Sequence, residues 1–234
     1  MIKIENTETF GWEAAIRGMR NPKLSYDKSD SYFVRGCDVG CGFLLGENDK
    51  KLAQTLADAG NDHGKFLRMI HVQCDVTAPL YWWKEADQYK VGTVTDSCST
   101  MHKIHAKEFT LDDFSHEHLI GEWDANVFDG LGETIADIDG KLCTMNGTDS
   151  LQLTVRLLNA YREKFLETKD KTYWWQMIQL LPSSYNQKRT WDLNYAVLKN
   201  IYHARKTHKL DEWVTLCKWI ESLPYSELIT GTRE

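Results

Sequence analysis

Apolar and polar positions along the chain follow two spacings, one typical of strands and one typical of helices. From Met69 to Val76 they alternate, as in a strand with one buried face. From Asp211 to Leu223 the apolar residues recur at intervals of three and four, which places them on one face of a helix. The same reasoning predicts a strand at Ile2–Ile4 and helices at Glu8–Met19, 47–60, Leu80–Lys90, Leu151–Phe165, Trp174–Leu181 and Thr190–Lys206. The sequence therefore predicts an α/β (α+β) fold with a mainly helical C-terminal half.

Two segments show neither spacing. Residues 91–101 are small and hydroxylated, and we expect a loop or a short strand there. Backbone N–H groups and hydroxyls in such a loop can hold a phosphate or a base, but they can equally cap the next element of structure. Residues 110–148 are acidic and interrupted by glycines, and we expect them to form irregular or partly helical surface.

Length and composition fit one folded domain. The 234 residues are 42% hydrophobic and include 9 Trp, 10 Tyr and 8 Phe, which is enough for a substantial core. Neither an internal repeat nor a flexible linker divides the chain, so we expect a single domain over residues 1–234. The sequence contains no apolar run long enough to cross a bilayer, and its N-terminus lacks the layout of a signal peptide. We therefore expect a cytoplasmic protein with no membrane partner.

The charge is distributed unevenly. Residues 108–149 carry eleven acidic side chains against one lysine, a local net charge of −10, whereas the whole chain has −6, so the rest sums to +4. We interpret the segment at about 108–149 as an acidic insertion on a mildly basic body. Such a distribution argues against a general nucleic-acid binder, whose positive surface would dominate, and leaves a small anionic ligand allowed. A contact surface for another protein is the alternative role for the insertion.

The six cysteines do not predict a disulfide framework, because they show no repeated spacing. Cys37 and Cys41 would suit half of a metal site, but no second pair at zinc spacing follows them. We therefore expect no metal.

Asn194 and Arg205 lie eleven residues apart on the helix expected at Thr190–Lys206, so both would project from nearly the same face. Leu198 and Ile201 lie between them. An amide and a guanidinium on either side of an apolar strip suit a flat heterocycle that carries a phosphate. The alternative is an amphipathic surface helix with two ordinary polar residues.

The run from Leu181 to Arg205 resembles the C-terminal signature of the flavin-dependent thymidylate synthases. Seven residues are in register with that signature without a gap: Leu181, Pro182, Trp191, Asn194, Leu198, Asn200 and Arg205. Further upstream, Val76–Pro79 resembles the strand end that precedes the family's RHRxxSxNExSxR motif, which would then start at Gln88. The N-terminal Arg17, Arg20 and Ser25 and the loop with His63 are similar to further family positions.

The resemblance implies a central, mainly antiparallel sheet with flanking helices, and a homotetramer with flavin sites shared between subunits. It implies FAD as cofactor and reductive C5-methylation of a deoxyuridine nucleotide, with NADPH and methylene-tetrahydrofolate as co-substrates. The alternative on the same scaffold is a catalytically inactive nucleotide-binding protein, so whether the chain is an enzyme stays open.

The resemblance also assigns roles to individual residues. FAD would contact Asn194, Asn200, Arg205, Tyr89, Lys90 and His63. The pyrimidine nucleotide would contact Gln88, Thr93, Asp96, Ser97, Ser99 and Arg205. The catalytic set would be Arg205, Lys90 and Asp96. Three family arginines are replaced by the uncharged residues Gln88, Thr100 and Ile178, and a fourth is replaced by Lys90. The predicted site is therefore less cationic, and an altered nucleotide substrate is a second expectation.

Overall fold

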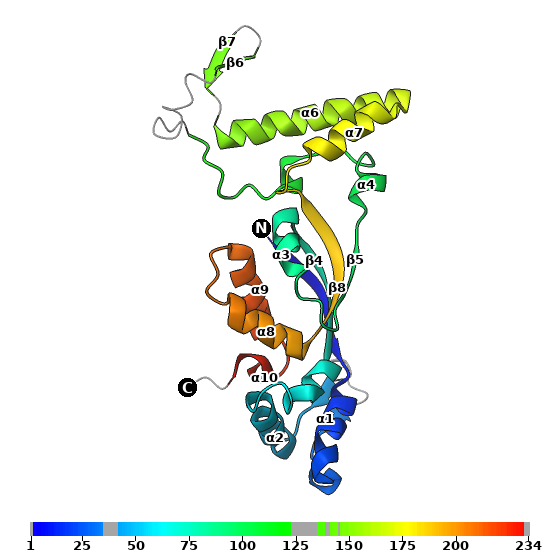
Figure 1. The fold of residues 1–234 in the computed structure, drawn as a ribbon, viewed down its shortest axis with the longest axis vertical. Helices are drawn as coiled ribbons and strands as arrows, with labels where there is room; N and C mark the ends of the chain where they lie inside the picture. The colour runs from blue at the N-terminus through cyan, green and yellow to red at the C-terminus, as the bar shows by residue number, and fades with distance from the viewer. Residues whose placement is uncertain (1, 35–41, 123–134, 139–140, 145, 232–234) are drawn as a thin grey trace. The chain divides into compact units, whose positions relative to one another are not determined.

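The computed structural model describes residues 2–34, 42–122, 135–138, 141–144 and 146–231 (Figure 1). The chain divides into two compact units. The first contains residues 78–83 and 98–187, and the second contains residues 2–77, 84–97 and 188–234. Cys37 and Cys41, which the sequence suggests as half of a metal site, lie outside the described residues.

A four-stranded sheet organises the second unit. Its order is β1 (Lys3–Phe10), β4 (His71–Pro79), β8 (Asn186–Asn194) and β5 (Val94–Ser97). The last two residues of β4 and the first two of β8 are counted with the first unit. Pairing is antiparallel between β1 and β4 and between β5 and β8. Along β4 every second side chain is buried, namely Val72, Cys74, Val76 and Ala78, as the alternation in the sequence predicts.

Five helices among the described residues belong to the second unit. They are α1 (Trp12–Arg20), α2 (Glu47–Asp58), α8 (Tyr195–Arg205), α9 (Asp211–Glu221) and α10 (Glu227–Thr230). Short 3-10 turns occupy Asn21–Lys23, Tyr26–Lys28 and Gly64–Met69. Strand β2 (Tyr32–Val34) pairs antiparallel with β3 (Gly42–Leu44). Helix α9 buries Trp213, Leu216, Cys217 and Ile220, the stripe that its sequence predicts. The helix expected at Asp211–Leu223 is thereby confirmed.

A pair of helices dominates the first unit, α6 (Gly147–Thr168) and α7 (Lys171–Leu180), which pack side by side (Figure 1). The unit also contains α4 (Thr100–Lys103), a 3-10 turn at Leu111–Asp113, and the antiparallel pair β6 (Ile135–Ile138) and β7 (Lys141–Thr144). Its core is Ile104, Phe109, Phe114, Leu151, Val155, Leu158 and Met177. Two of these residues, Phe109 and Phe114, come from the acidic segment, so the beginning of that segment is part of a core rather than only surface.

Helix α3 (Leu80–Ala86) follows β4 directly, and its residues divide between the two units. Trp82 and Trp83 on this helix are 0% and 1% exposed, and the Trp83 indole donates to the Gln187 carbonyl at 2.9 Å. Both rings therefore belong to packing rather than to a ligand surface.

The expected boundaries change most at three helices. Glu8–Phe10 belong to β1, where they pair with β4, so the first helix starts only at Trp12. The helix expected at Leu80–Lys90 ends at Ala86. The prediction that a helix starts near Thr190 is wrong. Residues 190–194 are the end of β8, where residues 190–192 pair with β5, and α8 begins only at Tyr195.

The corrected start of α8 changes the geometry expected of Asn194 and Arg205. Asn194 is the residue before the helix, so the two side chains do not share a helical face. Leu198 and Ile201 are both 0% exposed, and so they form core rather than an apolar strip for a heterocycle.

Within the described residues, no helix is long and apolar enough to span a membrane. The same residues contain no group of three or more His, Cys, Asp and Glu side chains placed to hold a metal ion.

Candidate functional site

The turn that follows α3 is closed by its own hydrogen bonds. The Gln88 N–H donates to the Glu85 carbonyl at 3.1 Å, and the Tyr89 N–H donates to the Ala86 carbonyl at 3.0 Å. The Thr93 hydroxyl then donates to the Tyr89 carbonyl at 2.7 Å. Gly92 has φ of +69°, a backbone conformation that glycine adopts without steric cost. Residues 87–93 are therefore held in a defined shape before any ligand is present.

Asn194 links this turn to the start of α8. Its Oδ1 accepts from the Val197 N–H at 3.0 Å, which is the hydrogen bond of a helix N-cap. Its Nδ2 donates to the Gly92 carbonyl at 3.1 Å. The side chain is buried, so the amide acts mainly as a bridge between two backbone segments.

A cavity of about 440 Å³ lies between the turn and α8. Its size is within the range of about 300–1,000 Å³ that is usual for small-molecule sites. Its lining consists of Asn61, Arg68, Gln88, Tyr89, Lys90, Val91, Asn194, Ala196, Val197, Lys199, Asn200 and His203. Amide and basic side chains predominate, and no carboxylate is among these lining residues. Such a surface suits an anion that also carries hydrogen-bonding groups.

The basic residues of this cavity differ in how far they are already engaged. Lys199 donates to the Ala57 carbonyl at 2.8 Å and lies 3.6 Å from the Asp58 carboxylate. Arg68 and Lys90 are exposed, and neither has an ion-pair partner among the residues that the structure describes. The charge available to a ligand is therefore that of Arg68 and Lys90.

A second cavity, of about 350 Å³, shares part of its wall with the first. It is lined by Ala86, Asp87, Tyr89, Lys90, Thr93, Thr95 and Trp191. Tyr89 and Lys90 line both cavities. Trp191 is buried and supplies an apolar wall, while Thr93 and Thr95 supply hydroxyls. Tyr89 and Lys90 therefore form a shared wall, and each of the two cavities can hold one ligand group.

Arg205 lines neither cavity. One terminal nitrogen of its guanidinium lies 3.0 Å from the Glu85 carboxylate, and its Nε donates to the Tyr89 hydroxyl at 2.9 Å. The guanidinium carbon lies 4.7 Å from the centre of the Trp213 ring. The Glu85 carboxylate also accepts from the Trp213 indole at 3.1 Å. The guanidinium is thus engaged by other side chains of the same unit.

The structure brings together part of the set of residues that the sequence assigns to the site. Gln88, Tyr89, Lys90, Asn194 and Asn200 line the first cavity, and Thr93 lines the second with Tyr89 and Lys90.

The other assigned residues lie elsewhere. Asp96 and Ser97 are exposed on β5, opposite Thr190 and Arg189 of β8. His63 is exposed at the start of a 3-10 turn and lines neither cavity.

Ser99 belongs to the first unit. Its side chain accepts from the His102 N–H at 3.0 Å and caps α4. This contact is the capping role that the sequence left open as an alternative for the hydroxyl-rich loop. A nucleotide-facing role for Asp96, Ser97 and Ser99 stays a prediction.

Four polar lining residues were not assigned to the site from the sequence: Asn61, Arg68, Lys199 and His203. His203 follows Asn200 by three positions on α8, so helical spacing from Asn200 gives a signal for it. Asn61 and Arg68 come from a loop and a 3-10 turn, and nothing local in the sequence marks them as neighbours of the turn at 87–93.

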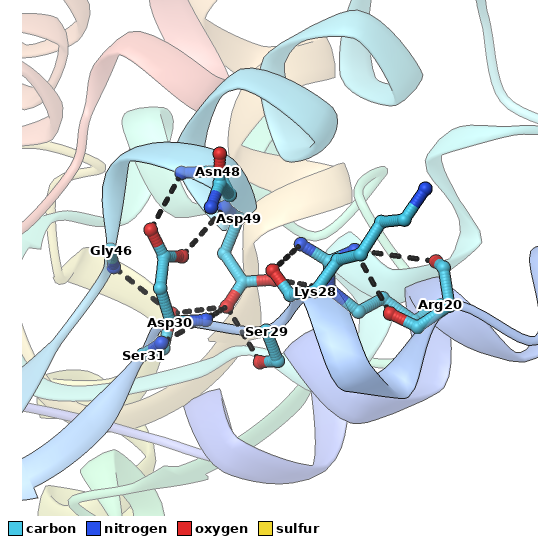
Figure 2. A network of polar contacts seen from close by, with 9 residues as sticks. Arg20, Lys28, Ser29, Asp30, Ser31, Gly46, Asn48 and Asp49 are labelled. Carbon is cyan, nitrogen blue, oxygen red and sulfur yellow. Dashed lines mark hydrogen bonds and ion pairs between the residues drawn. The ribbon is translucent and has the colours of Figure 1, made fainter.

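Arg20 and Ser25, which resemble family positions, form a structural network with Asp49 (Figure 2). The buried Arg20 side chain forms an ion pair with Asp49 and donates to both the hydroxyl and the carbonyl of Ser25. Its remaining terminal nitrogen donates to the Lys28 carbonyl at 3.0 Å. The guanidinium therefore fixes the loop that follows α1.

The Asp49 carboxylate is satisfied from several directions. Its Oδ2 accepts from the hydroxyls of Ser29 and Ser31, both at 2.7 Å, and from two backbone N–H groups at 3.1 Å (Figure 2). Burial by itself raises the pKa of this carboxyl. The hydrogen bonds from Ser31, Ser29 and Arg20 outweigh burial, so the pKa is lowered below its ordinary value.

Comparison with known proteins finds no matching family model and no curated protein with matching sequence. Solved structures, however, match nearly the whole chain. Thymidylate Synthase X (ThyX) from Helicobacter pylori, crystallised with FAD and dUMP, has a TM-score of 0.63 at 15% identity, covering 98% of this chain and 97% of that one. A second ThyX structure from the same organism, also with FAD and dUMP, has a TM-score of 0.62 at 15% identity and 97% coverage of both chains.

The chain has the fold of the flavin-dependent thymidylate synthases. The UMP/dUMP methylase PolB from Streptomyces cacaoi, bound with 5-Br dUMP, is also similar, with a TM-score of 0.58 at 13% identity over 98% of this chain and 95% of that one. The expected mixed fold with an antiparallel sheet is thereby confirmed. At these identities the likeness concerns the fold.

Proposed function

We propose that this chain binds FAD and a pyrimidine nucleotide and catalyses reductive C5-methylation of a deoxyuridine nucleotide. The observation that carries the proposal is the 440 Å³ cavity, which gathers Gln88, Tyr89, Lys90, Asn194 and Asn200 in one place. The resemblance in sequence assigned these residues to flavin and nucleotide, and the solved structures of the same fold were crystallised with FAD and dUMP.

The cavity lining fits a flavin dinucleotide. FAD carries a diphosphate and a flat heterocycle with carbonyl and nitrogen acceptors. Arg68 and Lys90 supply the positive charge for a phosphate, and the amides of Gln88 and Asn200 can donate to ring acceptors. The Tyr89 ring offers an aromatic surface beside them.

Each residue has a positioning or electrostatic task in this proposal. A bound flavin would supply the hydride, with NADPH as reductant and methylene-tetrahydrofolate as carbon donor. Lys90 lies at the wall between the two cavities, where its charge attracts an anionic group on either side. The threonine hydroxyls and the Trp191 ring of the second cavity suit a pyrimidine base and its sugar. Binding two ligands against the shared wall would bring their reacting rings together.

The test is a titration of the purified chain with FAD, followed by visible absorption and flavin fluorescence. We expect Lys90→Gln and Arg68→Gln each to weaken FAD binding by about tenfold, because each removes one charge-assisted hydrogen bond. Lys65→Gln is the matched control, since Lys65 is exposed on the same 3-10 turn as Arg68 and lines neither cavity. An anaerobic assay with NADPH, methylene-tetrahydrofolate and dUMP then tests turnover. Failure to take up FAD would refute the proposal.

A second candidate function is nucleotide binding without turnover. The observation in its favour is that Arg205 is engaged with Glu85, while Gln88 and Thr100 stand where the family motif has arginines. Fewer guanidiniums are then available to polarise a bound pyrimidine. Binding of dUMP without FAD uptake or product formation would favour this candidate.

A further inference from the structure

We propose that Arg205 is a positioning residue, which Glu85 and Trp213 hold in place so that it fixes the ring of Tyr89. The inference rests on the proposed function, because it concerns the wall between the two proposed ligand cavities. It differs from the role that the sequence suggested, in which Arg205 contacts the ligands directly.

The guanidinium of Arg205 has hydrogen-bonding partners at its edges and an aromatic ring against its face. The Glu85 carboxylate and the Tyr89 hydroxyl occupy two of its edges, at 3.0 Å and 2.9 Å. The Trp213 ring lies against it, with 4.7 Å between the guanidinium carbon and the ring centre. A planar cation held by a carboxylate and an aromatic ring is well ordered, since both contacts depend on its orientation.

Glu85 anchors this cluster. Its carboxylate accepts from both Arg205 and the Trp213 indole, and Trp213 is 0% exposed. The negative charge of Glu85 offsets the positive charge of Arg205, so the pair attracts an anion less than a lone arginine would. Lys90 and Arg68 carry the attraction instead.

The cluster of Arg205, Glu85 and Trp213 fixes the position of the Tyr89 side chain. Its backbone is fixed by the hydrogen bond from Thr93, and its hydroxyl is fixed by Arg205. Because Tyr89 lines both cavities, the orientation of its ring determines the shape of each.

Glu85→Gln separates the two roles of Arg205, because they predict opposite signs. If Arg205 positions Tyr89, loss of the carboxylate loosens the cluster and weakens FAD binding by about tenfold. If Arg205 binds a ligand phosphate directly, loss of the competing carboxylate frees the guanidinium and tightens the binding of FAD or dUMP. The glutamine can still accept from the Trp213 indole, which limits damage to the fold. Glu13→Gln, at an exposed position of α1, is the matched control.

A second measurement follows Tyr89 itself. Fluorotyrosine is incorporated, and the ¹⁹F resonance of Tyr89 is identified by its absence in Tyr89→Phe. We expect Glu85→Gln to shift and broaden this resonance, and Glu13→Gln to leave it unchanged. In a Tyr89→Phe background, Arg205→Ala should cause little further loss of FAD affinity, since the group that Arg205 holds is already gone.

FAD affinity and the Tyr89 resonance together decide between the two roles of Arg205. Weaker FAD binding with a shifted Tyr89 resonance supports the inference. Tighter binding, or unchanged FAD affinity in Glu85→Gln, overturns it. If the wild-type chain binds neither FAD nor dUMP, the proposed function fails, and the Tyr89 resonance alone then decides: a shift in Glu85→Gln supports the positioning role of Arg205, and an unchanged resonance overturns it.

Discussion

Arg20 and Asp49 form an ion pair with side chains 4% and 0% exposed. Removing two charges from water is costly, and here hydrogen bonds from Ser29, Ser31 and the loop backbone compensate the carboxylate. Arg20 is therefore a structural arginine in this chain, although its position in the sequence resembles a family motif.

Asp49→Asn should destabilise the fold by about 3–5 kcal/mol, because it leaves the buried Arg20 guanidinium without its counter-charge. Urea unfolding at neutral pH measures the change. Asp27→Asn is the control, since Asp27 is exposed in the same loop, and we expect its effect to stay within about 0.5 kcal/mol. Equal effects of the two variants would contradict the structural role of the pair.

The effect of Asp49→Asn should also depend on pH. The folded-state pKa of Asp49 is lowered from its ordinary value of 3.8, so the ionised form contributes stability above that value. This contribution is lost as the pH falls through the folded-state pKa. The gap in unfolding free energy between wild type and Asp49→Asn should therefore be constant above about pH 5 and shrink in more acidic solution. A gap that grows with acidity would contradict the sign.

Substitution of Gly92 tests whether the turn at 87–93 has room for a side chain beside Asn194. Its φ is +69°, and a Cβ added there would lie 2.8 Å from Nδ2 of Asn194. Gly92→Ala should displace the Asn194 amide and weaken FAD binding in the same titration. Gly231→Ala is the control, because Gly231 has φ of +85° but an added Cβ would meet nothing within 4 Å. We expect Gly92→Ala to be less stable than Gly231→Ala by about 1 kcal/mol, the value of the lost hydrogen bond. An equal loss of unfolding free energy in the two variants would mean that the positive φ alone, and not the contact with Asn194, causes the destabilisation.

At the scale of elements, the sequence predicts those parts whose apolar spacing agrees with their burial. Strand β4 and helix α9 are examples, because the same side chains that set the pattern are buried in the structure. The start of α8 could not be predicted in this way. Trp191 and Leu198 also fit a helical spacing, and it is the pairing of residues 190–192 with β5, which is distant in sequence, that places them in a strand.

In the candidate site, too, some residues are marked by the local sequence and others are brought in only by distant segments. Gln88, Tyr89 and Lys90 are contiguous, so a motif in the sequence can mark them. Asn61 and Arg68 reach the same cavity through the packing of a separate loop, for which a single sequence has no signal.

Substitutions at Asn194 separate its two contacts. Asn194→Ser keeps an N-cap for α8 but loses the amide that reaches the Gly92 carbonyl, whereas Asn194→Ala loses both. We expect Asn194→Ala to be less stable than Asn194→Ser by about 1 kcal/mol in urea unfolding. Both variants should bind FAD more weakly than wild type, because both release the turn. Unimpaired FAD binding by Asn194→Ser would show that the amide does not shape the cavity.

At the scale of the whole molecule, the resemblance to the family leads us to expect a homotetramer. Large apolar side chains on α6 and α7 are 40–45% exposed in the single chain, namely Leu153, Leu157, Trp175 and Leu180. Leu153 and Leu157 lie one turn apart on the same face of α6, and an exposed apolar face is a candidate surface for association. Light scattering after size exclusion should give four times 27.1 kDa, and the mass should persist on dilution when FAD is present. A monomer that binds FAD with full affinity would contradict this expectation.

The alternation of the two units along the chain has a consequence for synthesis. The backbone passes from one unit to the other at residues 77/78, 83/84, 97/98 and 187/188. The second unit needs the segment after residue 188 for β8, α8 and α9, so a ribosome completes the first unit before the second can close. Until then, β4 lacks β8, its neighbour in the sheet. Neither unit corresponds to a single uninterrupted stretch of coding sequence, so truncating the gene at any one point removes part of the second unit and leaves its sheet incomplete.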